Sequence, residues 1–212
     1  MRNRLSAAVV ATLLTLVVSP PAAAQQDNVI AVGVSFTTRQ SQSPTASNST
    51  DVGLAWRLGH GATGWGLATG LGWFVTDISQ PVAGVATELG ELHVRPFMAG
   101  YGYTYNMGRA SISAELLGGF AWVTFAQMPT AADVYRDRLG ARALDMRASN
   151  TVILRPQTNL WIDMSDKIGL NVSAAYPVAR PRLTTTSSLG EKSQRIRADM
   201  FAISAGIVYR IF

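Results

Sequence analysis

The sequence has no cysteine, only two histidines and few charges, since 15% of its 212 residues are Asp, Glu, Lys or Arg. A typical soluble domain carries about 25%. Without cysteine the chain has no disulfide framework, no thiolate zinc site and no thiol nucleophile. Disorder is excluded as well, because it requires low hydrophobicity and high net charge. Here 48% of the residues are hydrophobic, the mean hydropathy is +0.16 and the net charge is +5.

Long hydrophobic runs are also scarce. The one such run, residues 5–18, is shorter than the roughly 20 residues that a membrane-spanning helix needs. It follows Arg2 and Arg4 and precedes three alanines at 22–24, which is the order of a charged region, an apolar region and a cleavage site. We therefore expect residues 1–24 to be a cleaved secretory signal peptide and residues 25–212 to be the mature domain. A retained helical anchor is the alternative.

Nucleic acid is not an expected partner. The chain has the features of an exported protein, and no basic stripe with interleaved aromatics appears in it. Loss of Arg2 and Arg4 with the signal peptide also reduces the excess of 18 basic over 13 acidic residues. The remaining length fits one domain.

The mature sequence alternates between apolar and small or polar residues with a period of two. In the first segment Ile30, Val32, Val34 and Phe36 alternate with alanine, glycine, serine and threonine. This period is typical of a β-strand, whereas a helix repeats at three and four residues. Eight segments follow this pattern: 28–38, 51–58, 65–76, 91–98, 111–122, 151–163, 168–178 and 201–211.

The connections between these segments alternate in length. Short turns marked by Gly, Asn or Asp cover 59–64, 106–109 and 164–167. Long stretches rich in Ser, Thr, Ala and charge cover 39–50, 77–90, 126–149 and 180–195. This order predicts an all-β fold, an eight-stranded antiparallel transmembrane up-and-down β-barrel. Its long loops are extracellular, and its short turns and both termini are periplasmic.

Composition indicates which parity faces lipid. A soluble barrel or sandwich, such as a periplasmic binding protein, would point its apolar residues inward. Here the other parity holds glycines that suit the narrow inside of an eight-stranded barrel, so we expect the large apolar side chains outside. These glycines are Gly33, Gly53, Gly66, Gly70, Gly72, Gly169 and Gly206.

Charged residues share the inward parity. Because buried charges are costly unless paired, their mixed signs predict an ion network that plugs the lumen, with a polar conduit as the alternative. The expected lumen network is Arg57, Glu91, His93, Arg95, Glu115, Arg155, Asp163 and Arg210. On the outside, two aromatic girdles are expected from Trp56, Trp65, Trp73, Phe120, Trp122 and Tyr209.

The exported N-terminus, the eight alternating segments and the ending Ile207-Val208-Tyr209-Arg210-Ile211-Phe212 resemble the small outer-membrane β-barrel superfamily, the group of outer membrane proteins A and X. Residues 95–105, followed by 117–120, also resemble uncharacterised members. The resemblance implies the outer membrane of a Gram-negative-type bacterium and contact with its lipid and lipopolysaccharide. It also implies insertion by the barrel-assembly machinery, which would read Tyr209, Ile211 and Phe212.

The sequence departs from this pattern in two places. Phe212 falls on the parity opposite to Tyr209 and Ile211, so one residue overhangs or the last pair is bulged. Residues Tyr101, Tyr103 and Tyr105 share parity with the expected lumen residues 91, 93 and 95, although a girdle would place them outside. A bulge near residues 96–100 would reconcile the two.

Catalytic and metal chemistry is not expected. Resemblance to barrel deacylases would require a histidine with a serine, but His60 lies alone in a turn, and His93 has Glu91 and Arg95 on its face. The pair at 91 and 93 supplies at most two metal ligands, and the glycines of residues 64–70 open a strand rather than a dinucleotide-binding helix. We expect no enzyme activity, cofactor or metal.

The third long connection, 126–149, is expected to contain a short helix, capped by Thr130 and ended by Gly140. Its arginines are suited to lipopolysaccharide phosphates, although its aspartates fit an ordinary solvated loop. These arginines are Arg136, Arg138, Arg142 and Arg147. From all of this we expect a monomeric barrel with a structural or surface-interaction role. A narrow, porin-like channel for ions or small solutes is the alternative.

Overall fold

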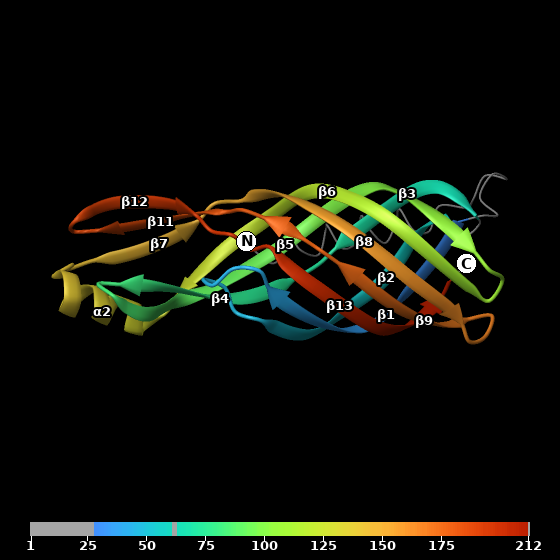
Figure 1. Cartoon of the computed structure of the whole chain (residues 1–212), viewed down its shortest axis with the longest axis horizontal. Helices are drawn as coiled ribbons and strands as arrows, with labels where there is room; N and C mark the ends of the chain where they lie inside the picture. The colour runs from blue at the N-terminus through green and yellow to red at the C-terminus, as the bar shows by residue number, and fades with distance from the viewer. Residues whose placement is uncertain (1–27, 61–62, 212) are drawn as a thin grey trace, which may run out of the picture.

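The structure is a computed structural model that describes residues 28–60 and 63–211. It is mainly antiparallel β-sheet with one helix (Figure 1). The elements are β1 (Asn28–Ser41), β2 (Ser49–His60), β3 (Gly64–Leu71), β4 (Phe74–Val82), β5 (Val85–Asn106), β6 (Ala110–Gln127), α2 (Pro129–Leu139), β7 (Leu144–Ala148), β8 (Thr151–Asp163), β9 (Ile168–Ala175), β10 (Val178–Ala179), β11 (Arg182–Ser187), β12 (Gly190–Arg195) and β13 (Met200–Arg210).

The main sheet has the hydrogen-bonded order β2-β1-β13-β9-β8-β6-β5-β3, with β4 on β5 and β10 on β8. Antiparallel architecture is therefore confirmed, but closure is not, because no ladder joins β2 to β3 in the described part of the chain. The expected number of eight strands is not confirmed either. The third segment divides at Gly72–Trp73 and the seventh at Tyr176–Pro177, where proline has no N–H for a ladder.

The two faces of the sheet follow the expected parity over most strands. Along β1, Val34 and Phe36 are exposed whereas Ser35 and Thr37 are buried. A contiguous apolar exterior of this kind is not found on ordinary soluble monomers. Other exposed apolar side chains of the sheet include Val52, Leu54, Leu67, Ile112, Leu116, Val152, Leu154, Ile203 and Ile207.

Strand β5 does not follow the expected assignment. Its register with β6 is continuous from Gly90 to Asn106, so it contains no bulge near residues 96–100. The exposed tyrosines 101, 103 and 105 therefore share the outer face with Glu91, His93 and Arg95. The lumen-side residues of this segment are Leu92, Val94 and Met98, all fully buried.

The expected loops are largely ordered elements. Residues 77–90 belong to a β4–β5 hairpin that turns at Ala83 and Gly84, and β7, β11 and β12 form a second sheet in the order β12-β11-β7. The expected helix is present as α2 and ends at Gly140 (φ 68°), but its N-cap is Met128 rather than Thr130. These elements gather at one end of the molecule, and the C-terminus lies at the other (Figure 1).

Two apolar clusters lie at the two ends of the main sheet. The larger one, the loop-end cluster, joins Ile78 and Leu92 to Leu117, Ile153 and Leu183, and so packs the ordered loop elements onto the barrel strands. This cluster is the reason why Glu91, His93 and Arg95 face outward. At this end the inner face of β5 packs against apolar side chains, so the polar side chains of the alternating strand lie on the outer face. The smaller one, the turn-end cluster, contains Ala31, Trp161 and Val208.

Candidate functional site

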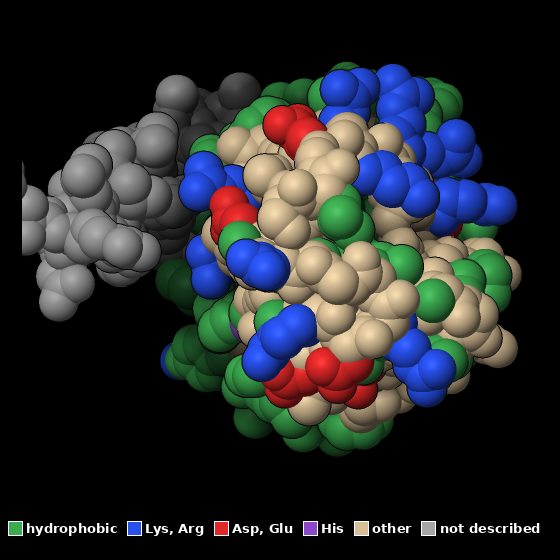
Figure 2. Space-filling model, turned by 90° about the vertical axis from the view of Figure 1, so that its left-hand side faces the viewer, with side chains coloured by type: hydrophobic (Ala, Val, Ile, Leu, Met, Phe, Trp, Pro, Cys, Tyr) green, Lys and Arg blue, Asp and Glu red, His purple; other side chains and the backbone are tan. Residues whose placement is uncertain are grey.

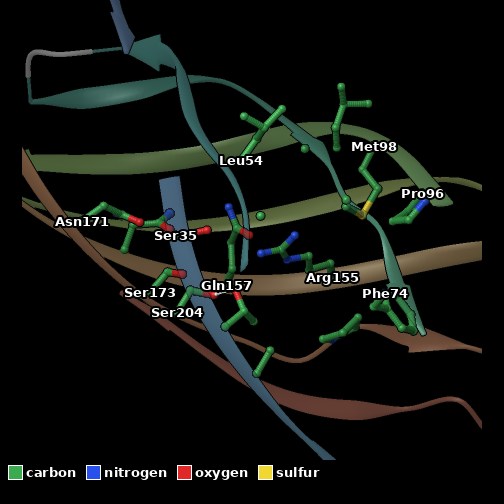
Figure 3. Close-up of a pocket in the computed structure, with 18 of the residues that line it drawn as sticks. Ser35, Leu54, Phe74, Pro96, Met98, Arg155, Gln157, Asn171, Ser173 and Ser204 are labelled. Atoms are coloured by element: carbon green, nitrogen blue, oxygen red, sulfur yellow. Dashed lines mark hydrogen bonds between the residues drawn. The ribbon is translucent and has the colours of Figure 1, made fainter. Parts of the chain in front are cut away.

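A cavity of about 990 Å³ occupies the lumen and is lined by residues of both apolar clusters, Met98 and Ile153 of the loop-end cluster and Trp161 of the turn-end cluster. Most of its inner wall is made of small hydroxyl, amide and glycine residues, as the inward parity predicts (Figure 3). The ionisable residues that line it are Arg39, Asp51, Glu115 and Arg155.

Strand β8 supplies much of the polar lining. Alternation along an antiparallel strand sends every second side chain inward, which places Arg155, Gln157, Asn159 and Trp161 in one inward row. In the next strand, Glu115 lies directly opposite Gln157.

Neutral donors surround the Glu115 carboxylate. Ser113 Oγ donates to Oε1 at 2.8 Å, Asn159 Nδ2 donates to the same oxygen at 3.1 Å, and Gln157 Nε2 donates to Oε2. The charge is thus stabilised by these hydrogen bonds, and no arginine side chain in the described part of the chain donates to it at hydrogen-bond distance. Elsewhere in the cavity Arg39 pairs with Asp51.

Arg155 stands apart from these pairs. Figure 3 shows its guanidinium projecting from β8 into the cavity beside Gln157. Its buried Nε has no hydrogen-bond partner, and the residue forms none of the side-chain hydrogen bonds or ion pairs of residues 28–60 and 63–211. Burial of a cation is costly unless it is paired and hydrogen-bonded. The Glu115 carboxylate stabilises the Arg155 charge only through space and Arg39 opposes it, so the cavity holds a donor without an acceptor.

The expected lumen network is divided among several places. Asp163 and Arg210 form an ion pair of 2.8 Å at the turn end, and Glu115 and Arg155 line the cavity. The expectation for Glu91, His93 and Arg95 is wrong, since they lie on the outer face: His93 Nε2 is 3.2 Å from Glu91 Oε2, and the Arg95 guanidinium lies 5.7 Å from the ring centre of Trp73. The side chain of Arg57 lies outside the described part.

The cavity also reaches the outer face of the wall between β2 and β3. These strands are the two ends of the hydrogen-bonded order and run next to each other. The cavity lining includes Leu54 and Leu67, which point outward and are 82% and 71% exposed. We call this break in the wall the lateral opening. The exposed apolar side chains of the outer face that line the cavity are Val34, Val52, Leu54, Leu67, Leu71 and Trp73.

Several of the expected girdle aromatics are exposed and in contact with one another. Trp65 lies 6.2 Å from Tyr101 in a stacked arrangement and 5.4 Å from Tyr103 edge-on. Phe120 and Trp122 form another edge-on pair at 5.4 Å. Trp73, Tyr209 and Ile211 are exposed too, while the side chain of Trp56 and residue Phe212 lie outside the described residues.

Sequence reasoning did not find Trp161, which lies inside the lumen, or the lateral opening. A signal for Trp161 was present, because it shares parity with Arg155, Gln157 and Asn159. The described residues contain no group of three or more His, Cys, Asp or Glu side chains placed to hold a metal ion. None of the described helices is both long and apolar enough to span a membrane.

No family model matches the chain, and no curated protein matches it in sequence. Among solved structures, the outer membrane protein OprG from Pseudomonas aeruginosa is similar with a TM-score of 0.71 at 10% identity, over 87% of this chain and 96% of that one. The outer membrane protein AlkL in lipid bilayers has a TM-score of 0.55 at 14% identity, over 91% and 94% of the two chains. The chain has the fold of the small outer-membrane β-barrels.

Proposed function

We propose that this outer-membrane β-barrel exchanges small, largely apolar molecules between its lumen and the surrounding lipid through the lateral opening. The observation that carries the proposal is the lining of the cavity, which combines lumen residues such as Ser173 with outward residues such as Leu54. A cavity of about 990 Å³ is within the size range of small-molecule sites.

The position of the two apolar clusters favours a lateral path over an axial one. The loop-end cluster includes Leu92, Val94 and Met98, which are fully buried inside the barrel, and the turn-end cluster includes Trp161. Water and ions would have to pass both clusters to cross along the axis. A porin-like pore that conducts ions along the axis is therefore less well supported than transport through the lateral opening.

The absence of cysteine allows a direct test. Leu54→Cys carries a unique thiol at the lateral opening, and modification with a bulky maleimide would obstruct it. We expect modification to slow entry of a neutral apolar fluorescent dye into cells that express the variant at least fivefold. Leu116→Cys, an equally outward position on β6, is the control and should retain its rate after modification. Equal dye entry in both modified variants would contradict the proposal.

A surface role is the second candidate, and one pair of residues favours it. Arg182 and Arg195 lie directly opposite each other on β11 and β12, and both are exposed. Like charges at paired positions repel, and lipopolysaccharide phosphates would relieve this repulsion. Figure 2 shows many Lys and Arg side chains on this end of the molecule.

Binding to immobilised lipid A tests this role. The double variant Arg182→Gln/Arg195→Gln should bind at least tenfold more weakly, while Arg109→Gln, at a turn near the opposite end, should bind normally. Normal binding by the double variant would exclude this arginine pair as the lipid A site.

We also propose that the chain is cleaved after residue 24, that the mature protein is a monomer, and that the barrel-assembly machinery inserts it by recognising Tyr209, Ile211 and Phe212.

A further inference from the structure

Among the described residues, the buried side-chain atoms that lack a hydrogen-bond partner all belong to the lining of one cavity. In the described part of the chain, four buried side-chain atoms have no hydrogen-bond partner: Ser49 Oγ, Thr69 Oγ1, Arg155 Nε and Gln157 Oε1. All four residues line the lumen cavity. Since buried polar groups are almost always hydrogen-bonded, such clustering indicates a place where a ligand supplies the missing partners.

We infer that the cavity selects single-chain amphiphiles that carry one small oxyanion, such as medium-chain carboxylates. The head group would bind Arg155, and the tail would extend into the lateral opening. This inference rests on the proposed lateral path and adds the substrate class.

The charges around the cavity favour an anion at Arg155. Arg39 is paired with Asp51, and its guanidinium lies 5.3 Å from the ring centre of Phe74. The Glu115 carboxylate accepts hydrogen bonds from three neutral side chains. Arg155 is therefore the cavity cation that forms no ion pair at contact distance within the described residues, although the Glu115 carboxylate acts on it through space. The guanidinium group suits a carboxylate because it can donate two parallel hydrogen bonds.

Other donors and the apolar lining complete the site. Ser49 and Thr69 hydroxyls can each donate, and both line the same cavity. The outward-facing Leu54 and Leu67 border the opening, so an aliphatic tail would contact these apolar side chains on its way to lipid. A neutral apolar molecule would leave the Arg155 charge unpaired, which is the physical basis of the preference.

Calorimetric titration of the purified barrel in phosphatidylcholine nanodiscs tests the inference, with empty nanodiscs to subtract partitioning. The probes are decanoate, decanol and decyltrimethylammonium, which share a tail and differ in charge. We expect decanoate to bind at least tenfold more tightly than the other two. Arg155→Gln should remove this advantage, Arg155→Lys should retain part of it, and Lys192→Gln, an exposed site on β12, should not change it.

The outcomes separate this inference from the lateral path. Equal binding of decanoate and decanol by the unmodified protein, unchanged in Arg155→Gln, would overturn the anion preference and leave the lateral path standing. Binding of no probe would contradict both. Loss of decanoate binding on adding phosphatidylglycerol to the nanodiscs would overturn the single-chain assignment in favour of a lipid head group. Heat-modifiable mobility on an unboiled gel verifies that each variant is folded.

Discussion

At the residue scale, the structure shows that glycines of one parity serve different purposes. Gly33 and Gly53 both alternate with large apolar residues in neighbouring strands. A Cβ added to Gly33 would lie 1.9 Å from the backbone oxygen of Ile207, whereas a Cβ at Gly53 would meet only Asp51 Oδ2 at 3.9 Å. Close approach of β1 and β13 therefore requires glycine at one position and not at the other.

This difference predicts opposite results for two alanine substitutions. Gly33→Ala should lower the free energy of unfolding by more than about 1 kcal/mol, because a backbone carbonyl has to move. Gly53→Ala should change it little. Urea unfolding in detergent micelles, followed by tryptophan fluorescence, compares the two variants. A Gly33→Ala barrel as stable as Gly53→Ala would contradict the described β1–β13 packing.

Leu170 tests the assignment of the lipid face. It points outward from β9 between its partners Ile162 and Ile207. Near the bilayer midplane Leu170→Arg should cost ~2 to 4 kcal/mol, whereas Leu170→Met should be nearly neutral. Equilibrium unfolding in lipid vesicles gives both values, and equal stabilities would reverse the face assignment. The adjacent Gly169 is a less suitable control than its parity suggests, since a Cβ there would lie 3.3 Å from the oxygen of Ile162.

At the scale of elements, the backbone conformation of one turn residue, Ala83, lowers the stability of the β4–β5 hairpin. The β4–β5 hairpin turns through Ala83 and Gly84, with φ of 48° and 82°. Both residues thus occupy the left-handed region, as a two-residue hairpin turn requires. Glycine adopts it freely, but alanine does so at a cost of about 1 kcal/mol or more.

The hairpin should therefore become more stable when Ala83 is replaced. Ala83→Gly is expected to slow amide hydrogen exchange in the flanking residues about fivefold, as a gain of about 1 kcal/mol implies. Ala86→Gly, opposite Pro81 in the same hairpin, should instead speed exchange. Faster exchange in Ala83→Gly would show that the turn does not adopt the described conformation.

Helix α2 gives a second test at this scale. Its N-cap, Met128, makes no side-chain hydrogen bond to the helix. Met128→Ser should add one and stabilise the helix by about 1 kcal/mol. Thr130→Ala should have little effect, since Thr130 follows the first helical residue, Pro129. Hydrogen exchange of the helix amides measures both, and a large loss of protection in Thr130→Ala would restore Thr130 as the cap.

At the scale of the whole molecule, two apolar clusters and a break in the wall determine where the cavity is closed and where it is open. The loop-end cluster includes Leu92, and the turn-end cluster includes Trp161. The wall between them is incomplete at β2 and β3. The main sheet thus surrounds a cavity that is bounded by an apolar cluster at each end and reaches the outer, apolar face of the sheet.

The sequence predicted the fold correctly where the alternation of inward and outward side chains continues along a whole strand. Parity placed Val34 outside and Arg155 inside, because a period of two is imposed locally by each strand. It failed at Glu91 and His93, because alternation shows that a strand has two faces but does not show which face is inside. At the loop end the inner face of β5 is apolar. The strands of the loop end, in residues 77–90 and in β7, β11 and β12, were missed because their order depends on contacts between distant segments, such as Ala46 with Ile78.

The lateral opening could not be read from the sequence either. Whether two neighbouring strands pair depends on the tilt and stagger of the whole sheet, and residues in β2 and β3 have the same alternation as those in paired strands. The candidate ligand residue Arg155 was predicted as a member of a network. The sequence did not show that Glu115 accepts its hydrogen bonds from Gln157 and Asn159 instead of from Arg155.

Amide–amide NMR contacts in the perdeuterated barrel in lipid bilayers test the central claim most directly. We expect regular cross-strand contacts between β1 and β2 and none between residues 52–54 of β2 and residues 67–71 of β3. A continuous antiparallel ladder across those residues would close the wall, separate the cavity from lipid and contradict the account.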